Sequence, residues 1–112
     1  MKPYVPERND VVWLDFDPQV GHEQAGRRPA LVLSPRPYNA RTGLFLACPI
    51  TSRVKGYPFE VLIPEGLEVS GAVLSNQIQC ADWRGRRAAL VCTLPPEVAE
   101  DVTDQLLALL PA

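Results

Sequence analysis

The chain has 112 residues, 46% of them hydrophobic, and its 11 basic and 13 acidic side chains give a formal net charge of −2. This length suits one hydrophobic core, so we expect a single domain over residues 1–112. No apolar run approaches the roughly 18 residues of a membrane helix. The first residues contain no apolar signal core, which predicts a cytoplasmic protein.

The three cysteines are widely spaced along the chain, at Cys48, Cys80 and Cys92. Zinc sites and redox motifs need closely paired cysteines, which this spacing does not provide. We therefore expect reduced thiols in the core, with no metal and no cofactor.

The basic residues are concentrated in the middle of the chain. No acidic residue lies between Gln24 and Phe59, and from Ala88 onward the charged residues are all acidic. A net acidic protein can still attract an anion into one groove, because the local potential dominates at contact distance. The alternative is that the arginines are scattered over solvated loops. The basic residues of the central region are Arg27, Arg28, Arg36, Arg41, Arg53 and Lys55, followed by Arg84, Arg86 and Arg87.

The first predicted strand covers Asp10–Asp17, where apolar and polar residues alternate, and Pro18 ends it. The polar loop that follows, residues 19–26, is of a kind that can cover a bound ligand. It contains His22, the only histidine. A lone loop histidine is more often solvent-facing than a general acid or base.

Two adjacent arginines, Arg27 and Arg28, directly precede a second predicted strand over Ala30–Ser34. A guanidinium group is always charged and presents a planar set of donors that matches phosphate oxygens. An arginine pair next to a rigid strand is therefore a candidate phosphate site. The alternative is a structural ion pair with Glu23 or with a nearby aspartate.

A loop rich in turn-forming residues is predicted over 35–43, followed by strands over Leu44–Ile50 and Phe59–Ile63. Thr51 and the serine after it stand at the exit of the first of these strands, close to Arg53 and Lys55. Hydroxyls beside cations suit a bound anion, and they equally suit a capped turn.

The region 72–87 combines amides, an aromatic ring and arginines. A strand over Ala72–Leu74 is expected to continue over Asn76–Cys80, where the amides can read base edges or satisfy the backbone of the sheet. The run Trp83–Arg87 has the composition of a stacking platform with phosphate donors. Alternatively, the tryptophan ring is part of the core.

The last predicted strand covers residues 90–92, and the only predicted helix runs over Pro96–Leu110. Val98, Val102, Leu106 and Leu109 form one apolar stripe on this helix, which packs on the sheet or on a second subunit. Five or six short strands and one terminal helix predict a mainly β (α+β) fold, most simply a partly open barrel.

Several segments occur in an order that resembles the MazF/PemK family of bacterial toxin endoribonucleases. The resemblance covers roughly Val5 to the terminal helix, and the combination of motifs is far more specific than any one of them. The segments are Asp10–Pro18, Gly21–Ser34, Pro49–Thr51, Lys55–Val61 and Asn76–Ile78.

The resemblance implies an SH3-like, plasmid-addiction-toxin barrel of short antiparallel strands with a C-terminal α-helix, which forms a homodimer. It also implies sequence-specific cleavage of single-stranded RNA without a metal, as in an mRNA interferase. A cognate MazE-like antitoxin would inhibit the toxin by placing its acidic C-terminal segment in the RNA groove. Two alternatives are a same-fold toxin that acts on a protein such as a topoisomerase, and a catalytically silent RNA binder.

By position, the resemblance implies a catalytic role for Arg28 and Thr51 and assigns Glu23 as the acidic residue of the loop before them. Arg28 would stabilise charge on the phosphate oxygens while the 2′-hydroxyl of the RNA attacks, and Thr51 would donate to the same oxygens. The acceptor of the 2′ proton is left open among Arg28, Glu23 and His22. The candidate RNA-binding residues are Arg27, His22, Arg53, Lys55, Ser75, Asn76, Gln77, Arg84 and Arg86.

Overall fold

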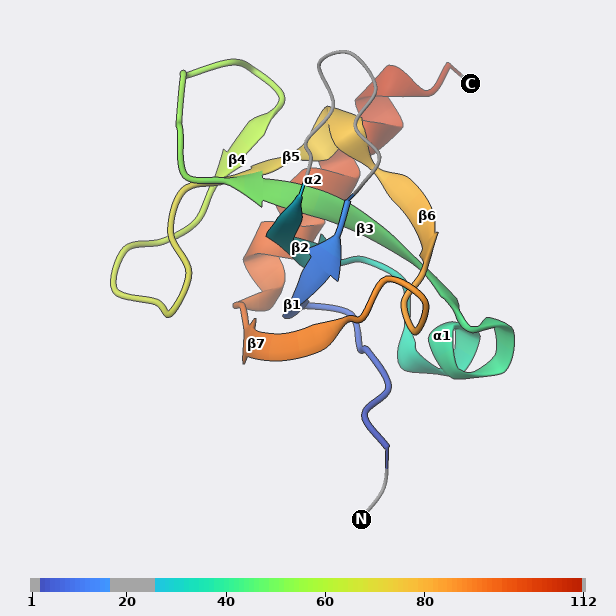
Figure 1. Cartoon of the computed structure of the whole chain (residues 1–112). Helices are drawn as coiled ribbons and strands as arrows, with labels where there is room; N and C mark the ends of the chain where they lie inside the picture. The colour runs from blue at the N-terminus through green and yellow to red at the C-terminus, as the bar shows by residue number, and fades with distance from the viewer. Residues whose placement is uncertain (1–2, 17–25, 112) are drawn as a thin grey trace.

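The computed structural model describes residues 3–16 and 26–111, which form one curved antiparallel sheet and two α-helices (Figure 1). The sheet has seven strands, more than the five or six expected. No helix of the described part is long and apolar enough to cross a membrane. In chain order the elements are β1 (Asp10–Asp15), β2 (Arg27–Val32), α1 (Arg36–Thr42), β3 (Leu44–Thr51), β4 (Glu60–Leu62), β5 (Ala72–Leu74), the 3₁₀ turn η1 (Ser75–Gln77), β6 (Gln79–Asp82), β7 (Ala89–Thr93) and α2 (Pro96–Leu109).

The longest strand, β3, organises the sheet. It pairs with β2 along one edge and with β6 and then β5 along the other, and the full order is β4-β5-β3-β2-β1-β7. Figure 1 shows β3 crossing the molecule, with α1 near its start and the β3–β4 loop beyond its end. The two edges of one strand therefore join β2 to β5 and β6.

The sheet has a hydrophobic core on each of its two faces. Successive residues of a strand point to opposite faces, so neighbouring residues belong to different cores. Val11, Leu31 and Cys48 belong to a core that α2 covers through Val98, Ala99 and Val102. Their neighbours Val12, Ala30 and Ala47 belong to a second core around Phe45 and Trp83. This explains why the sequences of β2 and β3 are apolar runs and do not alternate.

The prediction of a loop over residues 35–43 is wrong, because the chain forms helix α1 there. Its two prolines lie at the N-cap and in the first turn, where a missing N–H costs little, and Gly43 ends it at φ +72°. Asn39 is completely buried. Its side-chain amide donates to Pro6 O (2.9 Å) and Ser34 O (3.1 Å), and its side-chain oxygen accepts from Ser34 Oγ at 2.6 Å.

The stacking platform predicted for Trp83 is also wrong, and the alternative of a core residue is correct. The side chain is only 5% exposed, and Nε1 donates to the backbone oxygen of Asn39 at 3.0 Å. Arg84 covers the ring, with its Cζ 4.7 Å from the ring centroid. The predicted strand over Asn76–Cys80 is likewise only partly present, because η1 takes residues 75–77 before β6 begins.

Helix α2 confirms the predicted terminal helix, and three of the four residues of its apolar stripe pack on the sheet. Val98 and Val102 are buried, and Leu106 packs against the same core. Leu109, in contrast, is 59% exposed. The stripe therefore extends beyond the surface that this sheet covers.

The cysteines are all free thiols, as predicted, but only one is fully in the core. Cys48 is buried, Cys92 is half-buried and Cys80 is exposed. Cys80 is exposed because β6 lies along the edge of β3, where alternate side chains point to solvent.

Candidate active site

A groove of about 690 Å³ lies where β2 begins and β3 ends, beneath the β3–β4 loop (residues 52–59). Cationic, hydroxyl, amide and aromatic side chains line it together, which is the mixture that a phosphate-bearing chain with unpaired bases requires. The lining residues are Arg28, Thr51, Ser52, Arg53, Lys55, Tyr57, Phe59, Glu60, Leu74 and Gln77.

The pairing of β2 with β3 brings Arg28 and Thr51 into this groove. Ala30 pairs with Pro49 in antiparallel register, and continuing that register to the strand ends places Arg28 opposite Thr51. Residues directly opposite each other in such a pair project on the same face of the sheet. A guanidinium group and a hydroxyl from neighbouring strands therefore share one cavity.

Thr51 is only 7% exposed, and its hydroxyl also shapes the turn that follows. Its Oγ1 accepts a hydrogen bond from the backbone N–H of Arg53 at 3.1 Å. A hydroxyl that accepts this bond still carries its own hydrogen, which can be donated to a phosphate oxygen. The capped turn and the anion site, posed as alternatives from the sequence, are compatible.

An aromatic pair forms part of the groove wall, and sequence reasoning did not identify it. The rings of Tyr57 and Phe59 lie 5.3 Å apart between centroids, at 30° to each other, and Tyr57 is 49% exposed. The groove therefore has an accessible aromatic face, while Trp83, the ring chosen from the sequence, is buried. The signal was the aromatic spacing in the loop next to Arg53 and Lys55.

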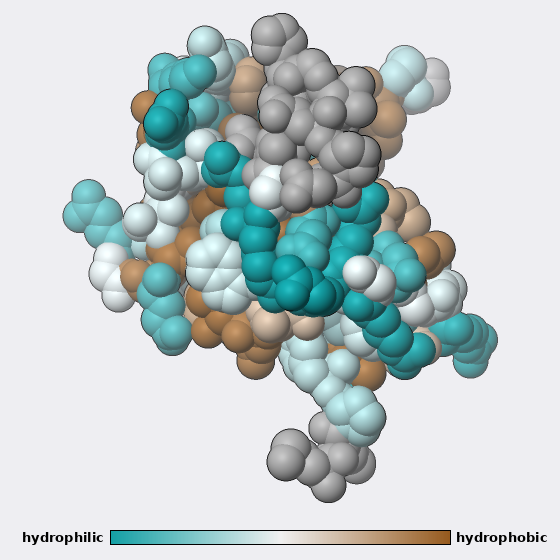
Figure 2. Space-filling view, viewed as in Figure 1, coloured by the Kyte–Doolittle hydropathy of each residue, from teal (hydrophilic) through white to brown (hydrophobic). Residues whose placement is uncertain are grey.

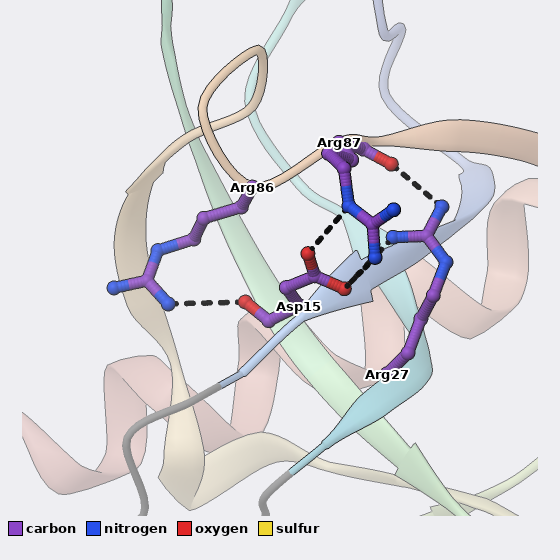
Figure 3. Close-up of polar contacts among 4 residues, drawn as sticks. All are labelled: Asp15, Arg27, Arg86 and Arg87. Carbon is purple, nitrogen blue, oxygen red and sulfur yellow. Dashed lines mark hydrogen bonds and ion pairs between the residues drawn. The ribbon is translucent and has the colours of Figure 1, made fainter.

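A second hollow, of about 590 Å³, lies elsewhere on the surface and is built around Asp15 (Figure 3). Arg27 Nη1 lies 2.9 Å from Asp15 Oδ1, and Arg87 Nε lies 2.8 Å from Asp15 Oδ2. Arg27 Nη2 also donates to the backbone oxygen of Arg87 at 2.7 Å, and Arg86 Nη1 to that of Asp15 at 3.0 Å. In the view of Figure 2, hydrophilic residues gather at the centre of the molecule, over β1 and the turn between β6 and β7.

The Asp15 cluster is held by charge. Hydrogen bonds from Arg87 and then Arg27 lower the pKa of the Asp15 carboxyl to about 2, and the same contact raises the pKa of Arg87. For Arg27, the structural ion pair with a nearby aspartate, one of the alternatives left open by the sequence, is thus present. Because Arg27 and Arg28 are consecutive residues of β2, one side chain enters this hollow and the other enters the groove.

The remaining predicted RNA-binding residues are divided among several places. Gln77 lines the groove, whereas Asn76 is exposed in η1 and is not among the lining residues. Ser75 is 0% exposed, and its Oγ lies 2.6 Å from Phe59 O and from Gln105 Oε1, so it holds the end of the β3–β4 loop and does not face a ligand.

The arginines of the turn between β6 and β7 lie outside the groove. Arg86 lines the second hollow, and Arg84 lies on the ring of Trp83. A contact of either one, or of Arg27, with RNA stays a prediction. His22 and Glu23 lie outside the described residues.

The described residues thus define a small curved-sheet protein with a cationic groove. Residues 7–110 match the family of PemK-like, MazF-like toxins of type II toxin-antitoxin systems. The endoribonuclease toxin MazF of Escherichia coli K12 is 50% identical over 94 residues, which are 84% of each chain. The endoribonuclease toxin ChpB of the same strain is 40% identical over 108 residues and 91% of each chain.

Solved structures show the same fold. A crystal structure of MazF from Deinococcus radiodurans is 55% identical, with a TM-score of 0.92 over 96% of this chain and 97% of that one. MazF in a MazE-MazF crystal structure from the same organism is 55% identical, with a TM-score of 0.87 over 96% of both chains. The chain therefore belongs to the PemK-like, MazF-like toxins of type II toxin-antitoxin systems. The mainly β (α+β) fold predicted from the sequence is confirmed.

Proposed function

We propose that Arg28 and Thr51 are the catalytic residues of this chain, an RNA-cleaving toxin of a toxin-antitoxin pair. The observation that carries the proposal is that both residues line one groove together with Arg53, Lys55 and Tyr57. The relatives named above are endoribonucleases, and the groove has the cations and the aromatic face that an RNA chain would contact.

The proposed reaction uses the 2′-hydroxyl of the RNA as the nucleophile. Its oxygen bonds to the adjacent phosphorus, the bond from phosphorus to the 5′-oxygen breaks, and the products carry a 2′,3′-cyclic phosphate and a 5′-hydroxyl. Charge builds on the oxygens bound to phosphorus, where Arg28 donates from a fixed strand position and Thr51 adds a neutral donor. A preorganised donor of this kind is typically worth about 10² to 10³ in rate.

The 2′-hydroxyl must lose a proton, and the 5′-oxygen must gain one. A guanidinium group with a pKa above about 12 is a poor base. Glu23, which precedes β2 in the chain, is our predicted helper for this proton transfer, and His22 is the second candidate.

Arg53 and Lys55 would bind backbone phosphates, and Tyr57 would stack on a base. Stacking of this kind requires unpaired bases, because the bases of a duplex are already stacked on each other. We therefore propose single-stranded RNA as the substrate, with sequence preference set by the shape of the groove.

We further propose that the chain acts in the cytoplasm as a homodimer and that a MazE-like antitoxin inhibits it. The proposed contact is an acidic C-terminal segment of the antitoxin lying in the cationic groove. The MazE-MazF structures from Deinococcus radiodurans support such a pairing. Sedimentation of the purified chain at several concentrations tests the homodimer.

The central test incubates the purified protein with a long RNA in excess chelator and maps the cuts and their end groups. Arg28→Ala is expected to lower the cleavage rate by about 10² to 10³ and Thr51→Ala by about 10-fold or more, while Thr51→Ser restores most of the rate. Arg41→Ala, which removes an exposed arginine of α1, is the matched control and should cleave at the parental rate.

A parental rate in Arg28→Ala would refute the catalytic assignment. A substrate with 2′-deoxyribose at a mapped cut site is expected to bind and to remain intact. Its cleavage would show that the 2′-hydroxyl is not the nucleophile.

A further inference from the structure

The wall of the cationic groove contains one acidic side chain, Glu60, at the first position of β4. Among the described residues, no lysine or arginine forms an ion pair with its carboxylate. Oε1 accepts hydrogen bonds from the backbone N–H groups of Lys55 (3.1 Å), Gly56 (2.8 Å) and Tyr57 (3.3 Å), and Oε2 lies 3.3 Å from the N–H of Lys55. Three successive N–H groups therefore converge on one carboxylate.

The backbone of the loop is shaped for this contact. Gly56 has φ +81°, a left-handed conformation that glycine adopts without strain, and it turns the N–H groups on either side toward the same point. Successive N–H groups arranged in this way form a concave anion-binding site. In this chain the anion is the carboxylate of Glu60, which occupies the site. The backbone N–H of Glu60 also donates to Tyr57 O at 3.0 Å, which closes the turn.

The rest of the loop is tied at its two ends. Thr51 Oγ1 accepts from the N–H of Arg53 at the start of the loop. Ser75 donates from its backbone N–H to Phe59 O at 3.1 Å at the end. The Glu60 contacts fall between these two ties, in the part of the loop where Lys55 and Tyr57 project into the groove.

A negative charge in a groove that binds a polyanion repels the ligand. Such a charge can favour binding only if it also has a stabilising effect that is larger than the repulsion. The N–H groups of the loop partly neutralise the carboxylate, and the charge in turn fixes the backbone that carries Arg53, Lys55 and Tyr57. A loop fixed in its binding conformation loses less conformational entropy when RNA arrives.

We propose that Glu60 is a positioning residue of the RNA groove, which holds the β3–β4 loop in its RNA-binding conformation before RNA is present. The inference rests on the proposed function, since it assigns the groove to RNA. It implies that an acidic residue strengthens the binding of an acidic ligand, which is the opposite of what charge alone predicts.

The test is whether removal of the Glu60 charge weakens RNA binding, as we propose, or strengthens it, as charge repulsion alone predicts. The probe is a short RNA that spans one cut site mapped with the parent protein and carries 2′-deoxyribose at that site, so binding is measured without cleavage. We expect Glu60→Gln to raise Kd by about 3-fold, because a neutral acceptor forms weaker hydrogen bonds, and Glu60→Ala to raise it by about 10-fold.

Glu65→Gln is the matched control, because it removes the same charge from an exposed glutamate in the loop after β4. It should leave Kd within about 2-fold of the parental value or tighten binding slightly. With cleavable RNA, Glu60→Ala should raise KM by about 10-fold and leave kcat within about 3-fold, because the loop holds RNA and does not touch the scissile phosphate. Equal or tighter binding of RNA by both Glu60 variants would overturn the proposal.

Hydrogen exchange of the free protein gives a readout that needs no RNA. The amides of Lys55, Gly56 and Tyr57 should exchange slowly in the parent and in Glu65→Gln, and faster in Glu60→Ala, while the amides of β3 keep their parental rates. Fast exchange at all three amides in the parent would refute the proposed role of Glu60 even if the chain cleaves RNA. If instead the parent does not cleave RNA, the proposed function fails. Hydrogen exchange would still show whether Glu60 holds the β3–β4 loop.

Discussion

Arg27 and Arg28 are chemically identical and adjacent in sequence, yet they belong to different sites. Arg27 is tied to Asp15 in one hollow, and Arg28 lines the groove with Thr51. The strand period of two separates them, because β2 begins at Arg27 and so includes both arginines, three residues before the predicted start at Ala30. The sequence could therefore indicate that a phosphate site was near. It could not show that Arg27 pairs with Asp15, because Asp15 comes close to Arg27 only through the pairing of β1 with β2.

The three thiols provide a prediction at the scale of single residues. Burial raises the pKa of Cys48 to about 12, and the side chain is completely enclosed, whereas Cys80 is exposed. A thiol reagent at pH 8 should modify Cys80 rapidly, Cys92 more slowly, and Cys48 only after unfolding.

Peptide mapping after a short exposure to the reagent identifies the modified residue. Cys80→Ser is the control, since it should remove the fast phase alone. Rapid modification of Cys48 in the folded protein would contradict the packing of β3 described above.

Among the elements, α1 shows most clearly what local sequence cannot reveal. Its two prolines and its turn-forming residues favour a loop when they are considered alone. The helix exists because Asn39 reaches Pro6 and Ser34, and because Trp83 donates to its backbone oxygen. The strands and α2 were predictable because their apolar spacing is local, whereas these contacts join residues far apart in the chain.

Asn39→Ala is expected to destabilise the fold strongly. The substitution keeps a good helix former but leaves Pro6 O and the Ser34 hydroxyl buried without their partner, so the free energy of unfolding should fall by about 3 kcal/mol. Urea unfolding measures the change. Arg41→Ala on the same helix serves as the control, and its free energy of unfolding should stay within about 0.5 kcal/mol of the parental value. An equally small effect of Asn39→Ala would show that the buried network contributes nothing.

The ion-pair cluster between β1, β2 and the β6–β7 turn predicts a pH dependence. The folded-state pKa of Asp15 is lowered from 3.8 to about 2, so the cluster stabilises the fold fully above pH 3.8 and loses this effect as the pH falls through 2. Asp15→Asn should therefore have a lower urea midpoint than the parent at neutral pH, and the difference should shrink between pH 4 and pH 2.

Because the cluster is on the surface, 1 M salt should also reduce that difference. Asp101→Asn, which changes an exposed aspartate of α2, is the control and should show no comparable gap at neutral pH. A gap between parent and Asp15→Asn that is independent of pH would assign the effect to packing and not to charge.

At the scale of the whole molecule, we propose that residues 1–112 unfold as one domain. The two cores lie on opposite faces of the same strands, so neither can be lost while the other persists. Unfolding measured by tryptophan fluorescence and by far-ultraviolet circular dichroism should therefore give coincident curves. The fluorescence change comes mainly from the buried Trp83. Two separated transitions would contradict a single domain.

The groove was the least predictable part of the molecule. Composition and family resemblance located several of its cations and the proposed catalytic pair, but the aromatic wall and the acidic residue within it depend on the path of the β3–β4 loop. Lys55 and Tyr57 could be assigned to a loop from the sequence. That Glu60 holds this loop could not, because a glutamate next to lysine and arginine is first expected to pair with them.

The alternation along β2 has a consequence for changes in chain length. If one alanine were inserted between Arg28 and Pro29 while the rest of β2 kept its pairing, Arg28 would rotate into the place of Arg27, and the groove would receive a methyl group. Such a variant would keep its net charge and both guanidinium groups, yet the groove would lack the arginine that we propose as catalytic. We therefore expect such a variant to lose RNA cleavage unless a second change restores the alternation of the two arginines.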